Sequence, residues 1–433
     1  MQHPHYENSF CETGVPLELQ SLYRFGIKLG LQNISSLLKS FYNPHHNMNF
    51  IHIAGTNGKG STSAMINSIF IKHGFKTGLY TSPHLVDFRE RFQINGKKIH
   101  PGELKKWVRL IMQILKKESI PGTFFEVITA IAINYFHYHN TDISVMEVGM
   151  GGRFDATNVI KPEVGIISQI DFDHQKYLGR TLKQISFEKA GIIKQDMDTV
   201  IGVKRTHLRD YFLNICHKRK SSPYLIDKDF YYVTNPNGTF DFCNNEISIK
   251  NIKISLRGKH QIRNASCAIQ ASFLYMKRKG LKINHEFIRD AIREVKWPGR
   301  FQILSSNPYI ILDGAHNMSG IRSLRETLET YYPDKDIVFL LGFLKDKPFI
   351  NMIKHLSDIG KTFMVAPLNH KRTVYPDKAG MIFSRVVPDI IFLPSVANGI
   401  EYYVNNLNSS SSILCITGSL FAVSEALLGK VCH

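Results

Sequence analysis

The stretch that decides the fold is residues 51–70, which read IHIAGTNGKGSTSAMINSIF. Ile51, Ile53 and Ala54 predict a buried strand, and the apolar residues after the glycines repeat at the i,i+4 spacing of a helix. The glycines let the backbone turn tightly and point N–H groups at one anion, beside the positive N-terminal end of the helix. Lys59 adds a mobile positive charge. Strand, loop and helix together predict a site for the phosphates of a nucleotide.

The loop departs from the general phosphate-loop pattern GxxxxGK[ST] at two places. Ile53 stands where the first glycine belongs, and Gly60 separates Lys59 from Ser61. A tight strand-to-helix turn with a solvated lysine is the alternative interpretation. The strand and helix on either side favour the nucleotide site, although the loop alone does not identify a reaction.

Length and composition indicate a globular protein of two domains. The 433 residues exceed what one core usually supports, and the hydrophobic content of 43% is ordinary. Six cysteines occur without a CxxC pair, so neither a zinc site nor a disulfide framework is indicated. The first residues, MQHPHYENSF, do not resemble a secretory signal, and no apolar run approaches the roughly 18 residues of a membrane span. We expect a cytoplasmic enzyme that does not bind membranes.

The net charge of +18 raises the question of nucleic-acid binding. The basic residues are dispersed in short groups such as 217–220 and 277–279, and no zinc-finger or RNA-recognition signature accompanies them. We therefore expect no nucleic-acid partner. Attraction of anionic small molecules explains the charge more simply.

Four predicted strands carry polar residues at their carboxyl ends. The strands are residues 51–54, 76–80, 143–148 and 164–170. Helical patterns lie between them, as a mostly parallel sheet covered by helices requires. Open sheets of this class bind ligands at the carboxyl edge. The polar residues expected at that edge are Lys59, Ser82, Glu147, Asp171, Asp173 and His174.

A second α/β pattern follows residues 297–299, where proline and glycine interrupt the preceding helical pattern. We place the domain boundary there, with a first domain of residues 1–296 and a second of residues 297–433. The predicted strands of the second domain are residues 309–312, 336–341, 362–366, 389–393 and 413–417.

Glu147 is an acidic residue inside an otherwise apolar strand, where an unpaired carboxylate would cost on the order of several kcal/mol. It requires a cation, and beside a nucleotide Mg²⁺ is the natural one because it takes oxygen ligands and bridges phosphates. Ser82 offers a hydroxyl ligand, whereas His174 suits a second metal or Mn²⁺. The alternatives are a turn hydroxyl for Ser82, a loop histidine for His174, and a buried arginine such as Arg153 as the partner of Glu147.

Lys189 falls on an apolar helical stripe with Leu182 and Ile185. Desolvation would lower its pKa and favour the neutral amine, which reacts with CO₂ to give a carbamate, an anion able to face a metal site. From helix geometry alone we favour the alternative, a snorkelling lysine whose ammonium reaches water.

With these residues identified, the chain resembles the folylpolyglutamate synthase and dihydrofolate synthase family, within the Mur ligase superfamily. The resemblance covers nearly the whole length. The matching segments are LGLQNISSLL, IHIAGTNGKGST, YTSPHL, RERFQING, TFFE, MEVGMGGRFDATN, DHQKYLG, EKAGIIK, GKHQIRNA, PGRFQ, DGAHN, GFLKDK and TGSLF. The resemblance implies an α/β fold: a P-loop-containing, Mur-ligase-like central domain with a mostly parallel sheet, and a smaller Rossmann-like C-terminal domain that closes over ATP and contributes to glutamate binding.

The resemblance implies an ADP-forming ligase that joins L-glutamate to a pterin carboxylate through an acyl phosphate. It implies two Mg²⁺ ions at Ser82, Glu147 and His174, a carbamate on Lys189, which reverses our preference from geometry, and catalytic roles for Lys59, Lys189 and His316. The residues matching its ATP contacts are Asn57, Gly58, Lys59, Gly60, Ser61, Thr62, Asn264, Arg300 and Asp313. Without the family, Arg300 reads equally as a surface linker residue and Asp313 as a helix cap.

Two substrates remain open. Dihydrofolate synthase adds the first glutamate to 7,8-dihydropteroate, folylpolyglutamate synthase extends the tail of reduced folates, and bifunctional bacterial members do both. We prefer the bifunctional enzyme because the chain has GGRFDATN, and a folylpolyglutamate synthase comes next. The positions matching the pterin contacts are Gly30, Leu31, Gln32, Asn33, Thr123, Phe124, Phe125, Glu126, Phe154, Asp155 and Ala156. Gln32, Asn33 and Phe172 depart from the usual pattern.

A cell-wall Mur ligase is the nearest rival. Only residues 1–50 precede the first strand, too few for its nucleotide-sugar domain, and the loop reads KGS rather than KT. A non-catalytic nucleotide- or RNA-binding protein is the rival from another class. We expect a monomer whose partners are dihydropteroate, reduced folates, L-glutamate and ATP.

Overall fold

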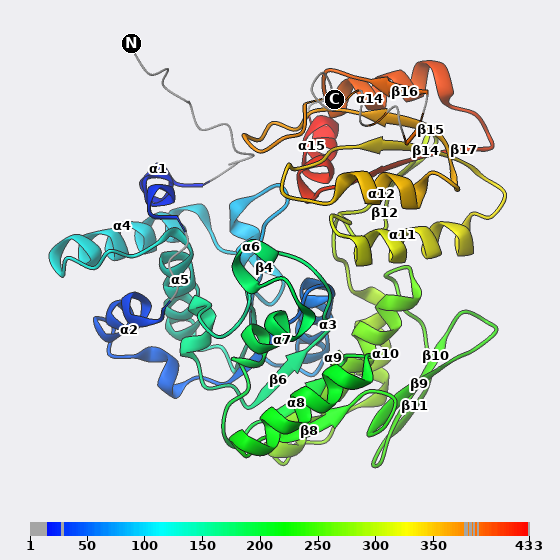
Figure 1. Ribbon diagram of the computed structural model, residues 1–433. Helices are drawn as coiled ribbons and strands as arrows, with labels where there is room; N and C mark the ends of the chain where they lie inside the picture. The colour runs from blue at the N-terminus through cyan, green and yellow to red at the C-terminus, as the bar shows by residue number, and fades with distance from the viewer. Residues whose placement is uncertain are drawn as a thin grey trace, which may run out of the picture.

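The computed structural model describes residues 15–26, 30–375, 380, 383, 386–387 and 389–431. The N-terminal stretch MQHPHYENSF, Cys11, Cys432 and Leu29 of the LGLQNISSLL segment lie outside the described residues. Two α/β domains follow each other along the chain, the first in blue to green and the second in yellow to red in Figure 1. In neither domain does a described helix combine the length and apolarity needed to cross a membrane.

The first domain is built on a sheet of eight strands in the order β4-β3-β2-β5-β1-β6-β7-β8. Its neighbouring strands pair in parallel, except that β3 is antiparallel to β2 and to β4. Its strands are β1 (Phe50–Ala54), β2 (Thr77–Tyr80), β3 (Phe92–Ile94), β4 (Lys97–Lys98), β5 (Ile143–Glu147), β6 (Val164–Ile167), β7 (Asp198–Ile201) and β8 (Ser222–Leu225). Every residue of β1 is buried. The predicted α/β fold with a mostly parallel sheet is confirmed.

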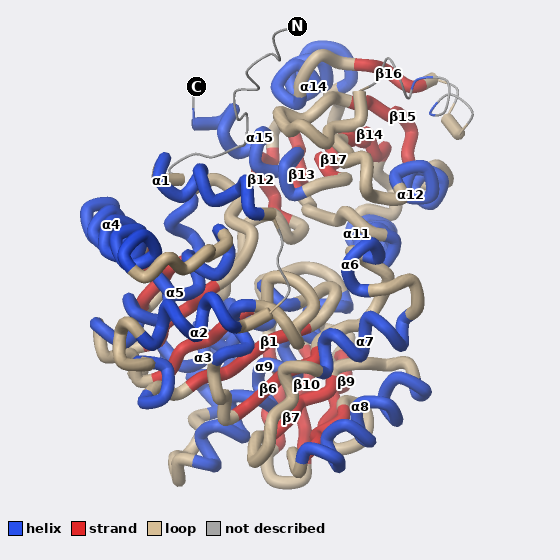
Figure 2. Tube along the Cα trace, turned by 60° about the vertical axis from the view of Figure 1, so that its left-hand side comes forward, coloured by secondary structure: helices blue, strands red, loops and turns tan. Residues whose placement is uncertain are grey.

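Helices cover both faces of this sheet (Figure 2). One core lies between the sheet and α3, α9 and α10, and another between the sheet and α2, α4 and α5. The helices are α1 (Leu17–Gln20), α2 (Gln32–Lys39), α3 (Lys59–Lys72), α4 (Pro101–Lys117), α5 (Phe124–Tyr138), α6 (Gln175–Leu178), α7 (Leu182–Ala190), α8 (Thr206–Arg219), α9 (Lys259–Arg278) and α10 (His285–Glu294). Helix α7 confirms the helical stripe predicted around Lys189.

A small antiparallel sheet packs on α9 and was not predicted from the sequence. Its strands are β9 (Phe230–Thr234), β10 (Phe240–Asn244) and β11 (Ser248–Ile252). Phe230, Phe240 and Phe242 bury one face of the sheet in the core shared with α3 and α9.

The second domain has a six-stranded sheet in the order β12-β13-β17-β14-β15-β16, in which only β12 is antiparallel to its neighbour among the described strands. One face packs on α11 and α12 and the other on α14 and α15. The elements are β12 (Gln302–Ser306), β13 (Tyr309–Leu312), α11 (Met318–Tyr331), β14 (Asp336–Leu341), α12 (Phe349–Leu356), β15 (Gly360–Val365), β16 (Ile390–Phe392), α14 (Val396–Tyr402), β17 (Ser412–Thr417) and α15 (Leu420–Val431).

Most predicted strands differ from the observed ones by one or two residues at an end, but the strand predicted over residues 164–170 is too long. Strand β6 ends at Ile167. The next residues cross the end of β1, where Thr56 N donates to Gln169 O at 2.6 Å and Ser168 Oγ donates to Asn57 O at 2.8 Å. Ser168 and Gln169 therefore form hydrogen bonds with the phosphate loop and do not extend strand β6.

The loop between β5 and β6 is joined closely to the end of α7. Arg153 N donates to Glu188 O at 2.8 Å, and Asn158 Nδ2 donates to Gly191 O at 3.2 Å. Gly191 permits this approach, because a Cβ at that position would lie 2.2 Å from the Cα of Arg153. The loop that contains GGRFDATN and the helix that contains Lys189 therefore share one packed junction.

Replacing Gly191 with alanine should destabilise the protein by about 1–3 kcal/mol, because the added methyl group meets backbone that cannot move without shifting the loop. Thermal unfolding followed by circular dichroism measures the effect. Gly429→Ala in α15 is the matched control, since no described heavy atom lies within 4 Å of that Cβ. Alanine favours helix there. Equal melting temperatures for the two variants would contradict the close packing.

Candidate active site

The loop between β1 and α3 is fixed by residues from distant parts of the chain. Gly58 precedes α3 with φ +87°, and the Asn264 amide of α9 occupies the space that a Cβ at Gly58 would need, 2.5 Å from Asn264 Oδ1. A Cβ on Gly60 would lie 2.9 Å from the indole nitrogen of Trp297. Lys59 Nζ donates to Gly55 O at 3.2 Å and to Thr56 O at 3.3 Å. The predicted strand, glycine loop and helix are confirmed.

A cavity of about 410 Å³ opens beside this loop, at the carboxyl ends of both large sheets. Many of the predicted residues line it, namely Asn57, Gly58, Lys59, Gly60, Ser61, Ser82, Phe124, Glu147, His174, Lys189, Asn264, Arg300, Asp313 and His316. Thr62 is buried in α3 outside the lining. Both domains contribute to one site.

Glu147 is buried at the end of β5, with 4% of its surface exposed. Parallel pairing places it opposite Ile53 of β1, next to the phosphate loop. Its Oε2 accepts a hydrogen bond from Ser82 N at 3.2 Å. Burial raises the pKa of Glu147 to about 7, against the opposing effect of the Lys59 charge. A buried carboxylate with so high a pKa is stabilised by an added cation, and the hydroxyl-bearing Ser82 adjoins it.

His174 lies at the same cavity in a left-handed backbone conformation, with φ 48°. Although 43% of its side chain is exposed, partial desolvation and the charges of Lys347 and Lys59 lower its pKa to about 4, so the imidazole is neutral and able to bind a metal. Among the described residues, no three His, Cys, Asp or Glu side chains form a metal-binding group. The predicted donors, Ser82, Glu147 and His174, would leave positions for water and phosphate oxygens, which Mg²⁺ commonly retains.

Lys189 is buried, with 4% of its surface exposed. Its Nζ donates to Gly55 O at 2.7 Å, and the same oxygen accepts from Lys59 Nζ. Burial, together with the Lys59 charge, lowers the pKa of Lys189 to about 7. The snorkelling alternative is wrong, because the ammonium ends on the phosphate loop.

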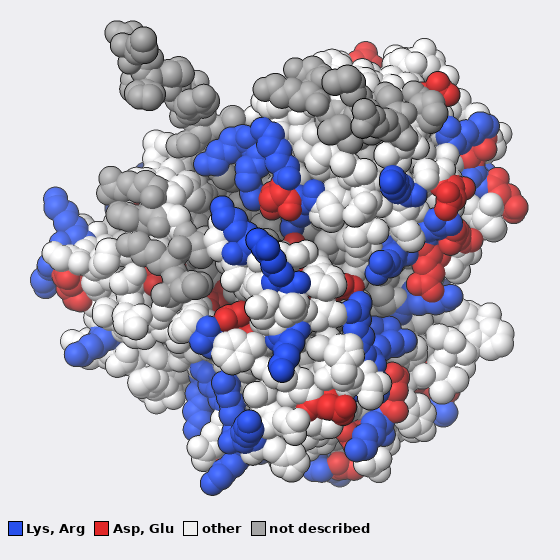
Figure 3. Space-filling view, in the orientation of Figure 1, with Lys and Arg blue, Asp and Glu red and all other residues white. Residues whose placement is uncertain are grey.

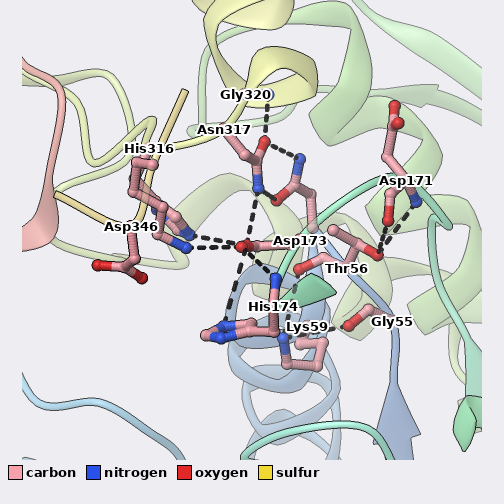
Figure 4. Close-up of polar contacts among 12 residues, drawn as sticks. Gly55, Thr56, Lys59, Asp171, Asp173, His174, His316, Asn317, Gly320 and Asp346 are labelled. Atoms are coloured by element: carbon pink, nitrogen blue, oxygen red, sulfur yellow. Dashed lines mark hydrogen bonds and ion pairs between the residues drawn. The ribbon is translucent and has the colours of Figure 1, made fainter. Parts of the chain in front are cut away.

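Asp173, which the sequence places at the carboxyl edge of the first sheet without a specific role, connects the two domains (Figure 4). Its carboxylate lies 2.6 Å from Lys347 Nζ, 3.3 Å from His316 Nε2 and 3.1 Å from Asn317 Nδ2. Burial raises the pKa of Asp173, but the hydrogen bond and charge of His316, with the charge of Lys347, bring it well below its usual range. Its signals in the sequence are its position after the predicted strand of residues 164–170 and its place in DHQKYLG, beside His174.

Asn317 extends this contact to the phosphate loop. The Asn57 and Asn317 amides exchange two hydrogen bonds, of 3.1 Å and 3.0 Å. Asn317 is also the N-cap of α11, because its Oδ1 accepts from Gly320 N at 2.8 Å. The helix-cap alternative for Asp313 is therefore wrong: its oxygens accept from Phe301 N and Ala315 N, both at 2.9 Å, in the turn before the helix.

The residues matching the pterin contacts mostly build local structure. Glu126 Oε2 accepts from Thr123 N and Thr123 Oγ1, both at 2.8 Å, in the capping box of α5, and from Asn33 Nδ2 at 3.3 Å. Leu31 and Gln32 begin α2. Of the eleven predicted pterin residues only Phe124 lines the cavity described above, with its ring 4.5 Å from that of Tyr23. Phe125 instead packs beneath Gly149.

Asp155 organises its own loop. Its Oδ2 accepts from Met150 N at 2.9 Å, and its Oδ1 accepts from Thr157 N at 3.1 Å and from Thr157 Oγ1 at 2.5 Å. Thr157 Oγ1 in turn lies 2.8 Å from Nε2 of the buried His52 in β1. The adjacent Phe154 ring stacks 4.1 Å from the Arg153 guanidinium. The pterin role of Asp155 stays a prediction.

Arg91 is a further cavity residue to which the sequence assigns no role. It is buried, its Nε donates to His84 Nδ1 at 2.9 Å, and its guanidinium lies 5.9 Å from the Phe124 ring. Its signal in the sequence is the RERFQING segment. Arg91 places a positive charge beside the aromatic wall of the cavity.

Comparison with known proteins accounts for nearly the whole chain. Residues 53–272 match the Mur ligase middle domain and residues 299–420 match the Mur ligase glutamate ligase domain. A dihydrofolate synthase/folylpolyglutamate synthase of Bacillus subtilis is 32% identical over 423 residues, covering 93% of this chain and 95% of the relative. A folylpolyglutamate synthase of Lacticaseibacillus casei is 33% identical, covering 92% and 94%.

Solved structures agree. The folylpolyglutamate synthase of Thermotoga maritima has a TM-score of 0.82 at 33% identity, covering 94% of each chain. The Mycobacterium tuberculosis folylpolyglutamate synthase complexed with ADP has a TM-score of 0.87 at 27% identity, covering 95% of this chain and 97% of its own. The chain is a member of the Mur ligase family, in the branch formed by the dihydrofolate and folylpolyglutamate synthases.

Proposed function

We propose that the protein is an ATP-dependent ligase that adds L-glutamate to 7,8-dihydropteroate and extends the polyglutamate tail of reduced folates. One observation carries the proposal: Lys59, Glu147, Lys189 and His316 line a single cavity between two domains. The Bacillus subtilis relative, named for both activities, supports the bifunctional form. The Lacticaseibacillus casei relative, named for the second activity, supports tail extension alone as the alternative.

The reaction has two steps. The substrate carboxylate attacks the γ-phosphorus of ATP, which forms an acyl phosphate and releases ADP. The glutamate amine then attacks the acyl carbon, loses a proton and expels phosphate as the amide bond forms. Lys59 would offset charge on the transferred phosphoryl group, and His316 lines the same cavity from the C-terminal domain.

Ser82, Glu147 and His174 would hold Mg²⁺, of which we propose two ions. When bound, Mg²⁺ neutralises charge on the phosphate oxygens. We propose a carbamate on Lys189, formed when its neutral amine adds to CO₂ and loses a proton. The buried position beside the phosphate loop and the pKa of about 7 support it.

We propose residues 1–296 as the ATP- and pterin-binding domain and residues 297–433 as the domain that closes over ATP and contributes to glutamate binding. The two large sheets share no strand, which supports this division. We also propose that the protein is a monomer. The described cysteines, Cys216, Cys243, Cys267 and Cys415, are free thiols and support the cytoplasm as the compartment. On the face seen in Figure 3, basic side chains form separate groups with acidic ones among them, which favours anionic small molecules over nucleic acid.

Phosphate release that requires both L-glutamate and a pterin substrate tests the proposal directly. A nucleotide-binding protein without ligase activity would show neither dependence. Glu147→Gln should lower this release by roughly 100-fold or more, because the buried amide cannot supply charge to a cation. Circular dichroism should show the fold unchanged.

Glu163→Gln is the matched control for Glu147→Gln. The Glu163 carboxylate accepts a hydrogen bond from Phe50 N, at the other end of β1, at 2.8 Å, and an amide oxygen accepts the same bond. Its activity should stay near that of the wild type. Wild-type turnover by Glu147→Gln would remove the metal assignment.

Lys189→Ala should lose turnover, and formate or acetate should restore part of it by replacing the carbamate anion. In the wild type, ¹³C NMR with labelled bicarbonate should detect a carbamate signal that grows as the pH rises through about 7. The signal should grow with pH because the pKa of Lys189 is lowered to about 7, and above that pH its amine is neutral and hence reactive. Lys194→Ala is the control variant for Lys189→Ala. A wild-type spectrum without a lysine carbamate would count against the modification of Lys189.

Asp155→Ala should impair dihydropteroate use more than tail extension, measured by assays with dihydropteroate and tetrahydrofolate in parallel. Thr157→Val separates loop structure from substrate contact, because it removes the hydroxyl that donates to Asp155 while keeping the carboxylate. Equal loss of both activities in Asp155→Ala would remove our reason for assigning Asp155 to the pterin. A wild type active only with tetrahydrofolate would establish the alternative function.

A further inference from the structure

The carboxylate of Asp173 lies where the carboxyl edges of the two large sheets meet. Asp173 lies after β6 in the first domain, whereas its partners His316 and Lys347 follow β13 and β14 in the second. We propose that Asp173 is a positioning residue, which holds His316 and Lys347 over the phosphate loop in the closed enzyme. The inference rests on the proposed function for its kinetic consequence and on the structure alone for its geometric one.

The ion pair between Asp173 and Lys347 exists only where the domains meet. Each side chain is 9% exposed, so both charges leave water together. A buried charge deprived of its partner is strongly unfavourable, because nothing else compensates its lost hydration. Removing one partner therefore favours the separated domains, in which the other charge is hydrated again.

Asp173 has the geometry of a group that acts through others. Its Oδ1 accepts from its neighbour's backbone, His174 N, at 2.8 Å and from Lys347 Nζ at 2.6 Å. Its Oδ2 faces His316 Nε2 and Asn317 Nδ2. Both oxygens are occupied by protein donors, so Asp173 orients the side chains that reach the cavity.

The same network fixes the phosphate loop relative to the second domain. Asn317 Nδ2 donates both to Asp173 Oδ2, at 3.1 Å, and to Asn57 Oδ1 of the loop, at 3.0 Å. Gln169 Nε2 adds a bond to Ser319 Oγ of α11 at 2.9 Å. The N-terminal end of α11 is thus aligned on the phosphate loop, with Asp173 as the only charged group of the first domain in this network among the described residues.

Asp171 provides a matched control two residues away. It is also buried, but its carboxylate accepts from Phe172 N at 2.9 Å and lies 3.6 Å from Arg205 Nη2, both in the first domain. Asp171→Asn and Asp173→Asn make the same chemical change. Only the second removes a charge shared between the domains.

The experiment compares wild type, Asp171→Asn, Asp173→Asn, Lys347→Met and the double variant Asp173→Asn/Lys347→Met. Small-angle X-ray scattering with a non-hydrolysable ATP analogue gives the radius of gyration, and steady-state kinetics give kcat and the KM of each substrate. Asp173→Asn should show a larger radius of gyration and a kcat lower by roughly 10-fold to 100-fold, since reacting groups are misplaced. Its KM for ATP should rise by a smaller factor than kcat falls, because the phosphate loop is intact and only the contacts from the second domain are loosened.

The double variant should be no worse than Asp173→Asn, because the two side chains act as one unit. The inference is overturned if Asp173→Asn matches Asp171→Asn in scattering and kcat, or if the losses at residues 173 and 347 multiply. Should Asp173→Asn fail to fold, Lys347→Met makes the same comparison from the other partner. A wild type without glutamate-dependent phosphate release would refute the proposed function, while the scattering comparison would still decide the role of Asp173.

Discussion

The parallel pairing of β1 between β5 and β6 is the constraint on which the site depends. It brings three chain segments to one edge of the sheet: the phosphate loop after β1, Glu147 at the end of β5, and the Asp173–His174 segment after β6. These segments are far apart in sequence, and neither their charges nor their hydrogen bonds would bring them together unaided. Because β1 is buried on both faces, a shift in its pairing would misplace buried side chains, so its register is fixed. The register in turn determines which functional residues lie next to one another.

Burial then sets the electrostatics of the cavity. It raises the pKa of Glu147 and lowers the pKa of Lys189, each to about 7, so that an acid and a base of very different ordinary strength titrate in one range. Lys59 contributes to both shifts, by opposing the first and assisting the second. A site so balanced gains stability from charges that a ligand supplies, namely a cation beside Glu147 and phosphates beside Lys59.

The sequence predicts the elements of the site better than their contacts. The strand, glycine loop and helix at residues 51–70 follow from local spacing, and so does the helix with Lys189. The depth at which Lys189 ends, and the pairing of Asp173 with Lys347, depend on elements more than a hundred residues away and have no local signature. The helix cap at Asn317 shows the same limit: a cap role for Asp313 is the alternative that the sequence leaves open, and two polar residues in one turn are equally good caps until the turn is folded. The small sheet β9–β11 buries only a few side chains of each strand, and these pack in the core that contains α9, so no regular alternation in the sequence predicts it.

The indole of Trp297 lies against Gly60, in the segment that connects the two large sheets. The chain has one other tryptophan, Trp107 of α4, whose ring lies 6.4 Å from that of Phe41 and 6.0 Å from that of Tyr138 and which does not line the cavity. The protein therefore contains an intrinsic fluorophore at its nucleotide loop and a second one that serves as an internal reference. A ligand bound at the loop would change the surroundings of Trp297 but not those of Trp107, and should therefore alter the emission of the unlabelled protein.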